Sequence, residues 1–265
     1  MKATRFRYLL LIAFITLSFN LSAQRTLKNI YNGSFKQGEH LRFRVHYGFI
    51  DAGFLTLDVT NENKVFGNNR NCWHIVGVGS SSGTFDFFFK IRDRYESFID
   101  AEAIVPWFHV RSVREGGFKF YETDNFNHYT GTVTNESGTY QIPEQVQDLV
   151  TSYYYTRCAY TPDMKEGELI PVKAFFDNEI ANFNVKFIGR TTLDMPNVGK
   201  VKCLKFRPQL LKGRAFKDQE GMTIYVSDDK NYIPIRLEAK ILVGSIKADL
   251  VEYSGLANPA TSITK

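Results

Sequence analysis

The chain has 265 residues and a formal net charge of +5, from 33 Lys and Arg against 28 Asp and Glu. Three of the basic residues, Lys2, Arg5 and Arg7, stand at the very start, and no long basic run follows them. This removes the electrostatic basis for binding a nucleic acid. The 23 Phe and 14 Tyr suit pleated, half-buried surfaces, so the composition predicts a mainly β protein.

Residues 1–23 have the pattern of a secretory signal peptide, with a basic start, an apolar run over residues 8–21 and a cleavage site after Ala23. The alternative is a transmembrane anchor, but that requires an apolar run of about 20 residues, longer than this one. The first cysteine is Cys72, so no cysteine follows the leader to be acylated. We therefore expect an exported, periplasmic mature chain that is soluble and has no transmembrane segment after cleavage.

After a lead-in over residues 24–37, the region 38–142 has the signals of a first β-meander. From Leu41 to Tyr47, apolar residues alternate with Arg and His, which is typical of a strand with one wet face. Turn-forming residues separate the segments that follow. The expected strands cover residues 41–47, 54–60, 72–78, 92–99, 107–114, 118–126 and 128–133.

Residues 143–164 are expected to form one central amphipathic helix with its linker. Pro143 suits a first helical turn, and Pro162 closes the segment. Apolar side chains recur at helical spacing and predict a face that packs on the sheet. They are Val146, Leu149, Val150, Tyr153 and Tyr154. Leu149 is expected to be a core residue.

The region 165–256 returns to the alternation typical of strands and forms a second β-meander. Its clearest alternation starts at Ile233, and Pro234 favours an early or edge position in that strand. Residues 257–265 are expected to be a polar tail. The expected strands cover residues 167–176, 183–188, 201–206, 222–227, 232–243 and 246–253.

The two meanders repeat one spacing of landmark residues. The first half has Phe54, Cys72, Asp100 and then, six residues on, Pro106. The second half has Phe183, Cys203, Asp228 and, again six residues on, Pro234. Self-similarity of this kind decides the architecture. The predicted fold is mainly β: a duplicated antiparallel β-meander that forms curved sheets or half-barrels, with one central amphipathic helix.

The cysteines and histidines predict neither a metal site nor a cofactor. Cys72, Cys158 and Cys203 are an odd number of thiols and include no Cys-x-x-Cys pair. A bridge from Cys72 to Cys203 requires the repeats to face each other closely, and buried unpaired thiols are the alternative. The five histidines are scattered singly, without the spacing of metal ligands.

Residues 79–83 match the Gly-x-Ser-x-Gly pattern of a hydrolase nucleophile, with Ser81 at its centre. That pattern requires a strand, a sharp turn and a helix above a parallel sheet. The residues after Gly83 show no helical stripe, so we interpret the segment as a flexible loop and predict no catalytic residue.

An aromatic connection, Phe85, Phe87, Phe88 and Phe89, follows this segment. Apolar clusters on connections signal binding surfaces. The equivalent connection of the second half is also apolar, with Leu210, Leu211 and Phe216. Two alternatives remain open: these seven residues line a lipophilic cavity or partner surface, or both connections fold into the core.

Four segments carry a family resemblance. They are residues 38–53, 147–157, 213–236 and 244–250, which resemble the N-terminal strand pair, the central helix and the C-terminal strands of the DUF3108 family of uncharacterised exported bacterial proteins. The resemblance implies a periplasmic location and brings no catalytic residue. In architecture alone, the chain is distantly similar to the half-barrels of periplasmic lipoprotein carriers, but with one helix where those have several.

Our leading hypothesis is a non-enzymatic periplasmic β-protein that binds an envelope component, either a lipophilic molecule or an envelope protein. One alternative is a hydrolase of envelope polymers or esters that uses Ser81 or a carboxylate pair. The other is a structural adaptor without a small ligand. We expect no nucleic-acid partner, and the oligomeric state is left open.

Overall fold

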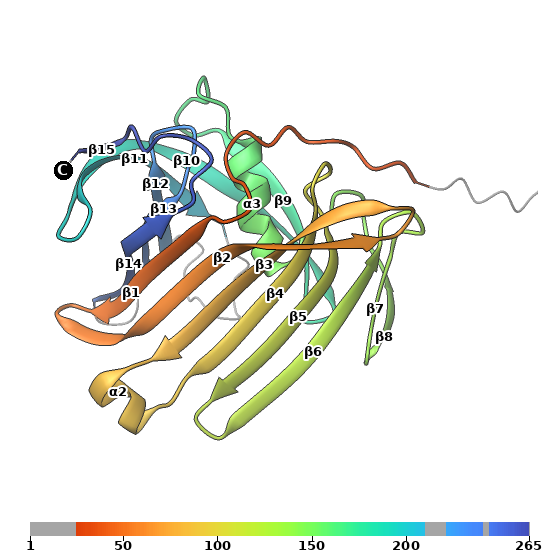
Figure 1. The fold of residues 1–265 in the computed structure, drawn as a ribbon, viewed down its shortest axis with the longest axis horizontal. Helices are drawn as coiled ribbons and strands as arrows, with labels where there is room; N and C mark the ends of the chain where they lie inside the picture. Colours follow the sequence, from red (N-terminus) through yellow and green to blue (C-terminus); the bar gives the residue numbers. More distant parts are fainter. Residues whose placement is uncertain (1–24, 210–220, 241–243, 265) are drawn as a thin grey trace, which may run out of the picture.

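The computed structural model describes residues 25–209, 221–240 and 244–264. Within them, 15 strands form one antiparallel sheet, which is strongly curved (Figure 1). The sheet stays open because its two end strands, β8 and β9, do not pair with each other. The mainly β, curved antiparallel fold is thereby confirmed. The strands of the first half are β1 (His40–Tyr47), β2 (Ile50–Phe66), β3 (Arg70–Ser81), β4 (Arg92–Asp100), β5 (Pro106–Glu115), β6 (Phe118–Asn127), β7 (Thr132–Asn135) and β8 (Gly138–Gln141).

The second half adds strands in the same up-and-down order. They are β9 (Leu169–Phe176), β10 (Glu179–Met195), β11 (Gly199–Pro208), β12 (Met222–Ser227), β13 (Pro234–Lys240), β14 (Ser245–Ser254) and the short β15 (Ile263–Thr264). The two halves join through β1 and β14, which pair along their whole length, with Leu41 opposite Tyr253. One continuous sheet results, in the order β8 to β1 and then β14 to β9, and β15 pairs with β11.

Corresponding strands of the two halves carry corresponding landmarks. β2 and β10 each have 17 residues and a register shift that lets a long strand bend. Cys72 lies on β3 and Cys203 on β11, the second strands of the two hairpins that β2 and β10 begin. Pro106 and Pro234 are the first residues of β5 and β13.

The hairpin turns before these prolines also match. In each turn a backbone N–H donates at 2.8 Å to the carbonyl just before the proline, from Asp100 to Val105 and from Ser227 to Ile233. Each turn also holds a residue in the left-handed region, with φ of 51° at Ile104 and 49° at Tyr232. Non-glycine residues adopt this conformation rarely, so its recurrence supports a duplication. Ser227, rather than Asp228, is the equivalent of Asp100.

Several boundaries differ from the sequence-based expectation. The loop expected after residue 60 is shorter, because β2 continues to Phe66. The strand expected over 128–133 is largely a turn, and β8 had not been predicted. The C-terminal residues, expected as a polar tail, place β15 against β11, with Ile263 opposite Val201.

The three cysteines are free, so no bridge joins Cys72 and Cys203. Both are fully buried in separate hydrophobic clusters. Burial raises the pKa of the Cys203 and Cys158 thiols to about 12 and raises that of Cys72 as well. Cys72 and Cys203 therefore behave as small core hydrophobes, and the raised pKa of all three disfavours the reactive thiolate.

The central helix, α3 (Leu149–Ala159), begins later than Pro143. Gln147 makes a parallel bridge to β9 instead, donating its N–H to Lys173 and accepting from Phe175, both at 2.8 Å. Asp148 then caps the helix, since its carboxylate accepts from the Thr151 N–H. The helix lies between the strands of the first half and β9 to β11 (Figure 1).

The buried face of α3 is the predicted one except at Leu149. Val150 and Tyr154 pack in a cluster with Ile75 and Ile99 of β3 and β4, and Tyr154 is fully buried. Leu149, by contrast, is 50% exposed, so its prediction as a core residue was wrong. Leu149 is the first helical residue, and its neighbour Val150, rather than Leu149 itself, packs against β3 and β4.

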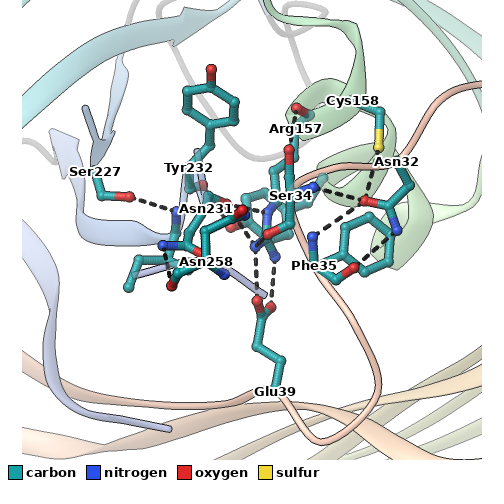
Figure 2. Close-up of polar contacts among 12 residues, drawn as sticks. Asn32, Ser34, Phe35, Glu39, Arg157, Cys158, Ser227, Asn231, Tyr232 and Asn258 are labelled. Carbon is teal, nitrogen blue, oxygen red and sulfur yellow. Dashed lines mark hydrogen bonds and ion pairs between the residues drawn. The ribbon is translucent and has the colours of Figure 1, made fainter. Parts of the chain in front are cut away.

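A buried ion pair fixes α3 to the rest of the molecule (Figure 2). The Arg157 guanidinium donates to both carboxylate oxygens of Glu39, at 2.6 and 2.8 Å, and both side chains are almost fully buried. It also donates to the backbone carbonyls of Ser34 and Asn231. Burial opposes the charge on Arg157, but the Glu39 carboxylate outweighs it, so the pKa of Arg157 is raised above its usual value.

The same site ties in both ends of the described chain. Asn258 donates its side-chain amide to the Gly33 carbonyl at 2.8 Å, and its backbone N–H to the Asn231 side chain at 2.8 Å. The rings of Phe35 and Tyr154 lie beside the Arg157 guanidinium, within 5.3 Å. The lead-in, the start of β1, the helix, the β12–β13 turn and the C-terminal segment therefore meet at one point.

The two faces of α3 predict opposite responses to truncation. Leu149→Ala should change the free energy of unfolding by less than about 0.5 kcal/mol, because this side chain is exposed. Tyr154→Ala should cost about 3 to 5 kcal/mol, because it empties a fully buried aromatic site. Urea unfolding followed by far-UV circular dichroism measures both. A loss of about 2 kcal/mol or more in Leu149→Ala would contradict this assignment of the helix faces.

Removing one partner of the ion pair should lower the free energy of unfolding by more than removing both partners. Arg157→Met leaves the Glu39 carboxylate buried and uncompensated, which should cost about 3 to 5 kcal/mol. Arg157→Met combined with Glu39→Leu should cost less than the sum of the two single changes. Thermal and urea unfolding of the four proteins gives this coupling energy. Additive losses would show that the two side chains are independent.

Candidate apolar binding site

Several connections between strands lie along one border of the sheet, the border that is formed by strand ends and not by an edge strand. The register places the last pairs Tyr47 with Ile50, Ser80 with Arg92 and Glu115 with Phe118 at this same edge. The β1–β2 turn, the helix between β3 and β4 and the β5–β6 turn follow one another along it (Figure 1). We call this border the aromatic edge, after the exposed side chains of Phe49, Phe85, Phe87, Phe88, Phe89 and Phe118.

The connection between β3 and β4 is a short helix, α2 (Gly83–Phe88), where the sequence had predicted a flexible loop. Gly83 starts it with a φ of 56°, and Asp86 suits its first turn. α2 has no buried residue, and Phe87 and Phe88 are 86% and 77% exposed. The alternative in which this connection folds into the core is therefore wrong for these rings.

The four predicted phenylalanines have different surroundings. Phe85 turns toward the ends of β1 and β2, where it lines a cavity. Phe89 packs against the β5–β6 turn, close enough that a Cβ at Gly116 would lie 3.0 Å from its ring. Phe87 and Phe88 contact each other edge to face at 5.4 Å and point outward. Leu210, Leu211 and Phe216 lie outside the described residues.

The cavity beside α2 has a volume of about 630 Å³ and an almost entirely apolar lining. This volume is within the range of about 300 to 1,000 Å³ typical of small-molecule sites. Its mouth lies among exposed side chains of the aromatic edge, including Tyr47, Ile50 and Ile246. The interior is lined by strand residues, among them Val45 and Leu55.

Sequence reasoning missed most of these lining residues. Val45 and Leu55 belong to ordinary alternating strands, and their pattern is the same as that of residues packed in the core. Ile91 precedes β4 and Ile246 lies on β14, so the two residues are far apart in the chain. Only Phe85 had a local signal, the aromatic run itself.

Ser81 occupies the end of β3 and is engaged in structural hydrogen bonds. Its hydroxyl donates to Asp86 at 2.5 Å and accepts from the Ile91 N–H at 2.8 Å. Hydrogen bonds from Arg92 and from Ser81 lower the pKa of Asp86 to about 2. A carboxylate this acidic is a weak base at neutral pH. Although a helix does follow the motif, the sheet is antiparallel, and a hydrolase assignment has no support.

A second cavity, of about 580 Å³, lies over β2, β3 and β4 and has charged side chains in its lining. His74 is held there between Glu62 at 2.9 Å and Glu96 at 2.7 Å, so both ring nitrogens are occupied by carboxylates. An imidazole held in this way is not free to serve as a general base. Among the described residues, no group of three or more His, Cys, Asp or Glu could hold a metal ion.

A third cavity lies between α3 and the second half of the sheet. Its volume is only about 40 Å³, enough for water-sized molecules and not for a ligand. The cavity at the aromatic edge is therefore the best candidate for a binding site in the described part of the chain.

The chain belongs to the family described as "Protein of unknown function (DUF3108)", whose pattern it matches over residues 42–251. A search of curated proteins finds no match. Neither helix of the described segments has the length and apolarity needed to cross a membrane.

Solved structures resemble the chain in fold. A β-barrel-like protein of the DUF1849 family from Brucella abortus aligns with a TM-score of 0.50 at 8% identity, over 86% of this chain and 99% of that one. A protein provisionally assigned as a lipoprotein, from Parabacteroides distasonis, aligns with a TM-score of 0.36 at 10% identity, over 85% of this chain and 99% of that one. The first likeness shows a shared fold alone, and the second is too weak to support an inference.

Replacing Ser81 should reveal a structural role and no catalytic one. Ser81→Ala removes the hydrogen bonds to Asp86 and Ile91, and we expect a loss of about 1 kcal/mol in the free energy of unfolding. Hydrolysis of p-nitrophenyl esters, measured on the wild type and the variant, should stay at the uncatalysed background in both. Turnover by the wild type that disappears in a folded Ser81→Ala variant would contradict this prediction.

Proposed function

We propose that this protein is a non-enzymatic, exported binding protein that holds a lipophilic envelope molecule in the cavity at the aromatic edge. The observation that carries the proposal is the cavity of about 630 Å³, whose lining is apolar and whose mouth is open between Tyr47, Phe85 and Ile246. Exposed apolar surface of this extent is costly in water unless a partner or ligand covers it.

The nature of the lining selects the class of ligand. The side chains that surround the cavity include Val45, Leu55, Ile91 and Phe85. Such walls offer dispersion contacts and few hydrogen bonds, so they favour an acyl chain or a similar apolar group over a sugar or a peptide. A polar headgroup would remain at the mouth, in water.

The proposed location is the periplasm, reached by way of a signal peptide over residues 1–23. The support comes from the sequence pattern of the leader, since these residues lie outside the described part of the chain. A lipophilic ligand fits this location, because such molecules need a carrier in an aqueous compartment between membranes.

Filling the cavity should weaken ligand binding. Gly79 lies opposite Leu55 in the β2–β3 register and so shares its face of the sheet. A Cβ at Gly79 would meet its nearest atom at 4.0 Å, which leaves room for a larger side chain directed along the cavity wall. Gly79→Leu should weaken the binding of cis-parinaric acid, followed by its fluorescence, by at least about tenfold (about 1.4 kcal/mol).

Gly117→Leu is the matched control, because this glycine also has open space around it and does not line the cavity. It should bind cis-parinaric acid with the affinity of the wild type. Absence of saturable binding by the wild type, or equal binding by Gly79→Leu, would contradict the proposal. Ester turnover dependent on Ser81 would instead favour a hydrolase.

A further inference from the structure

The aromatic edge carries more exposed apolar surface than the cavity uses. Phe49 at the β1–β2 turn is 92% exposed, and Phe118 at the β5–β6 turn is 58% exposed. Between them, Phe87 and Phe88 project from α2. None of these four rings lines the cavity. They need an explanation other than ligand contact, because four phenylalanines this exposed at one edge are costly in water.

The shape of this surface favours a bilayer over a folded protein. The three connections follow one another along the border (Figure 1), and each carries exposed rings. The rings are therefore separate projecting tips rather than one groove into which a single partner element would fit. Projecting aromatic side chains are the means by which proteins anchor in the interfacial layer of a membrane without crossing it.

The charges beside the tips point to the same occupant. Lys90, Arg114 and Lys119 are exposed next to α2 and the β5–β6 turn. Asp86 is paired with Arg92 and Asp51 with Arg44. Two further carboxylates lie near the tips, Glu115 opposite Phe118 and Asp93 beside Arg114, and the three cations outnumber them. The edge therefore presents cations to its surroundings, which complements anionic lipid headgroups.

We propose that the aromatic edge docks on an anionic lipid bilayer, with Phe49, Phe87, Phe88 and Phe118 inserted in the interface. The mouth of the cavity then faces the membrane, because Tyr47, Ile50 and Phe85 lie at the same edge. Docking itself stands on the exposed rings and the cations. The further step, exchange of a lipophilic molecule between bilayer and cavity, rests on the proposed function.

Vesicle co-sedimentation of the mature chain tests the docking. The probes are vesicles of phosphatidylethanolamine and phosphatidylglycerol at 3:1, compared with vesicles of phosphatidylcholine alone. The wild type should bind the anionic vesicles, and this binding should weaken as salt is raised because part of the attraction is electrostatic. Phe87→Ser combined with Phe88→Ser should reduce vesicle binding by at least about tenfold, which corresponds to about 1.4 kcal/mol.

The matched control is Tyr31→Ser combined with Val65→Ser, which removes two apolar side chains that are 87% and 67% exposed but lie away from the aromatic edge. This control should bind vesicles within about twofold of the wild type. Thermal melts of both double variants should match the wild type, since the replaced side chains are exposed.

The outcomes separate docking from ligand binding. Phe87→Ser with Phe88→Ser should retain the binding of cis-parinaric acid and lose the binding of vesicles. Gly79→Leu should retain the binding of vesicles and lose the binding of cis-parinaric acid. Failure of the wild type to bind either kind of vesicle would overturn the docking. So would a loss of vesicle binding in the control variant equal to that in the tip variant. Loss of a defined envelope protein partner in the tip variant, without vesicle binding by the wild type, would assign the edge to a protein.

Discussion

The buried pair of Arg157 and Glu39 is the interaction on which the arrangement of this molecule depends. Two opposite charges are removed from water there, which is tolerable only because the carboxylate and two backbone carbonyls take up the guanidinium donors. Those partners come from the lead-in, the start of β1 and the β12–β13 turn. The helix is thereby fixed between two halves of a sheet that does not close on itself.

This arrangement gives the sheet two unlike edges. At one, the lead-in, the end of α3 and the segment around Asn258 meet at the β12–β13 turn and satisfy one another's polar groups. At the other, the connections project freely and carry α2 and the exposed phenylalanines. The duplicated meanders share the turns that precede Pro106 and Pro234, so the scaffold is repeated. The described binding features, however, belong to the first half and the junction with β14.

The cavity explains why an aromatic run occurs on a connection in the first half. Phe85 closes its wall, whereas Phe87 and Phe88 leave it and face outward. The catalytic alternatives have little support at these sites. The Ser81 hydroxyl is hydrogen-bonded to the strongly acidic carboxylate of Asp86, and the His74 ring is held between two other carboxylates. What remains is a surface suited to apolar contact, at a site where polar groups are already satisfied.

The sequence by itself determined the mainly β strand pattern and the existence of one central helix, and it predicted a duplication, because alternation, spacing and turn residues are local signals. It also singled out the aromatic connection of Phe85, Phe87, Phe88 and Phe89, because four phenylalanines within five residues are a local signal. Only the tertiary structure decided that the halves join through β1 and β14, that Leu149 is exposed and that Val45, Leu55 and Ile246 share a cavity. The physical reason is that the burial of a side chain depends on which residues distant in the chain pack against it. The same alternating pattern can therefore lie on a solvent-exposed face, in a core or around a cavity.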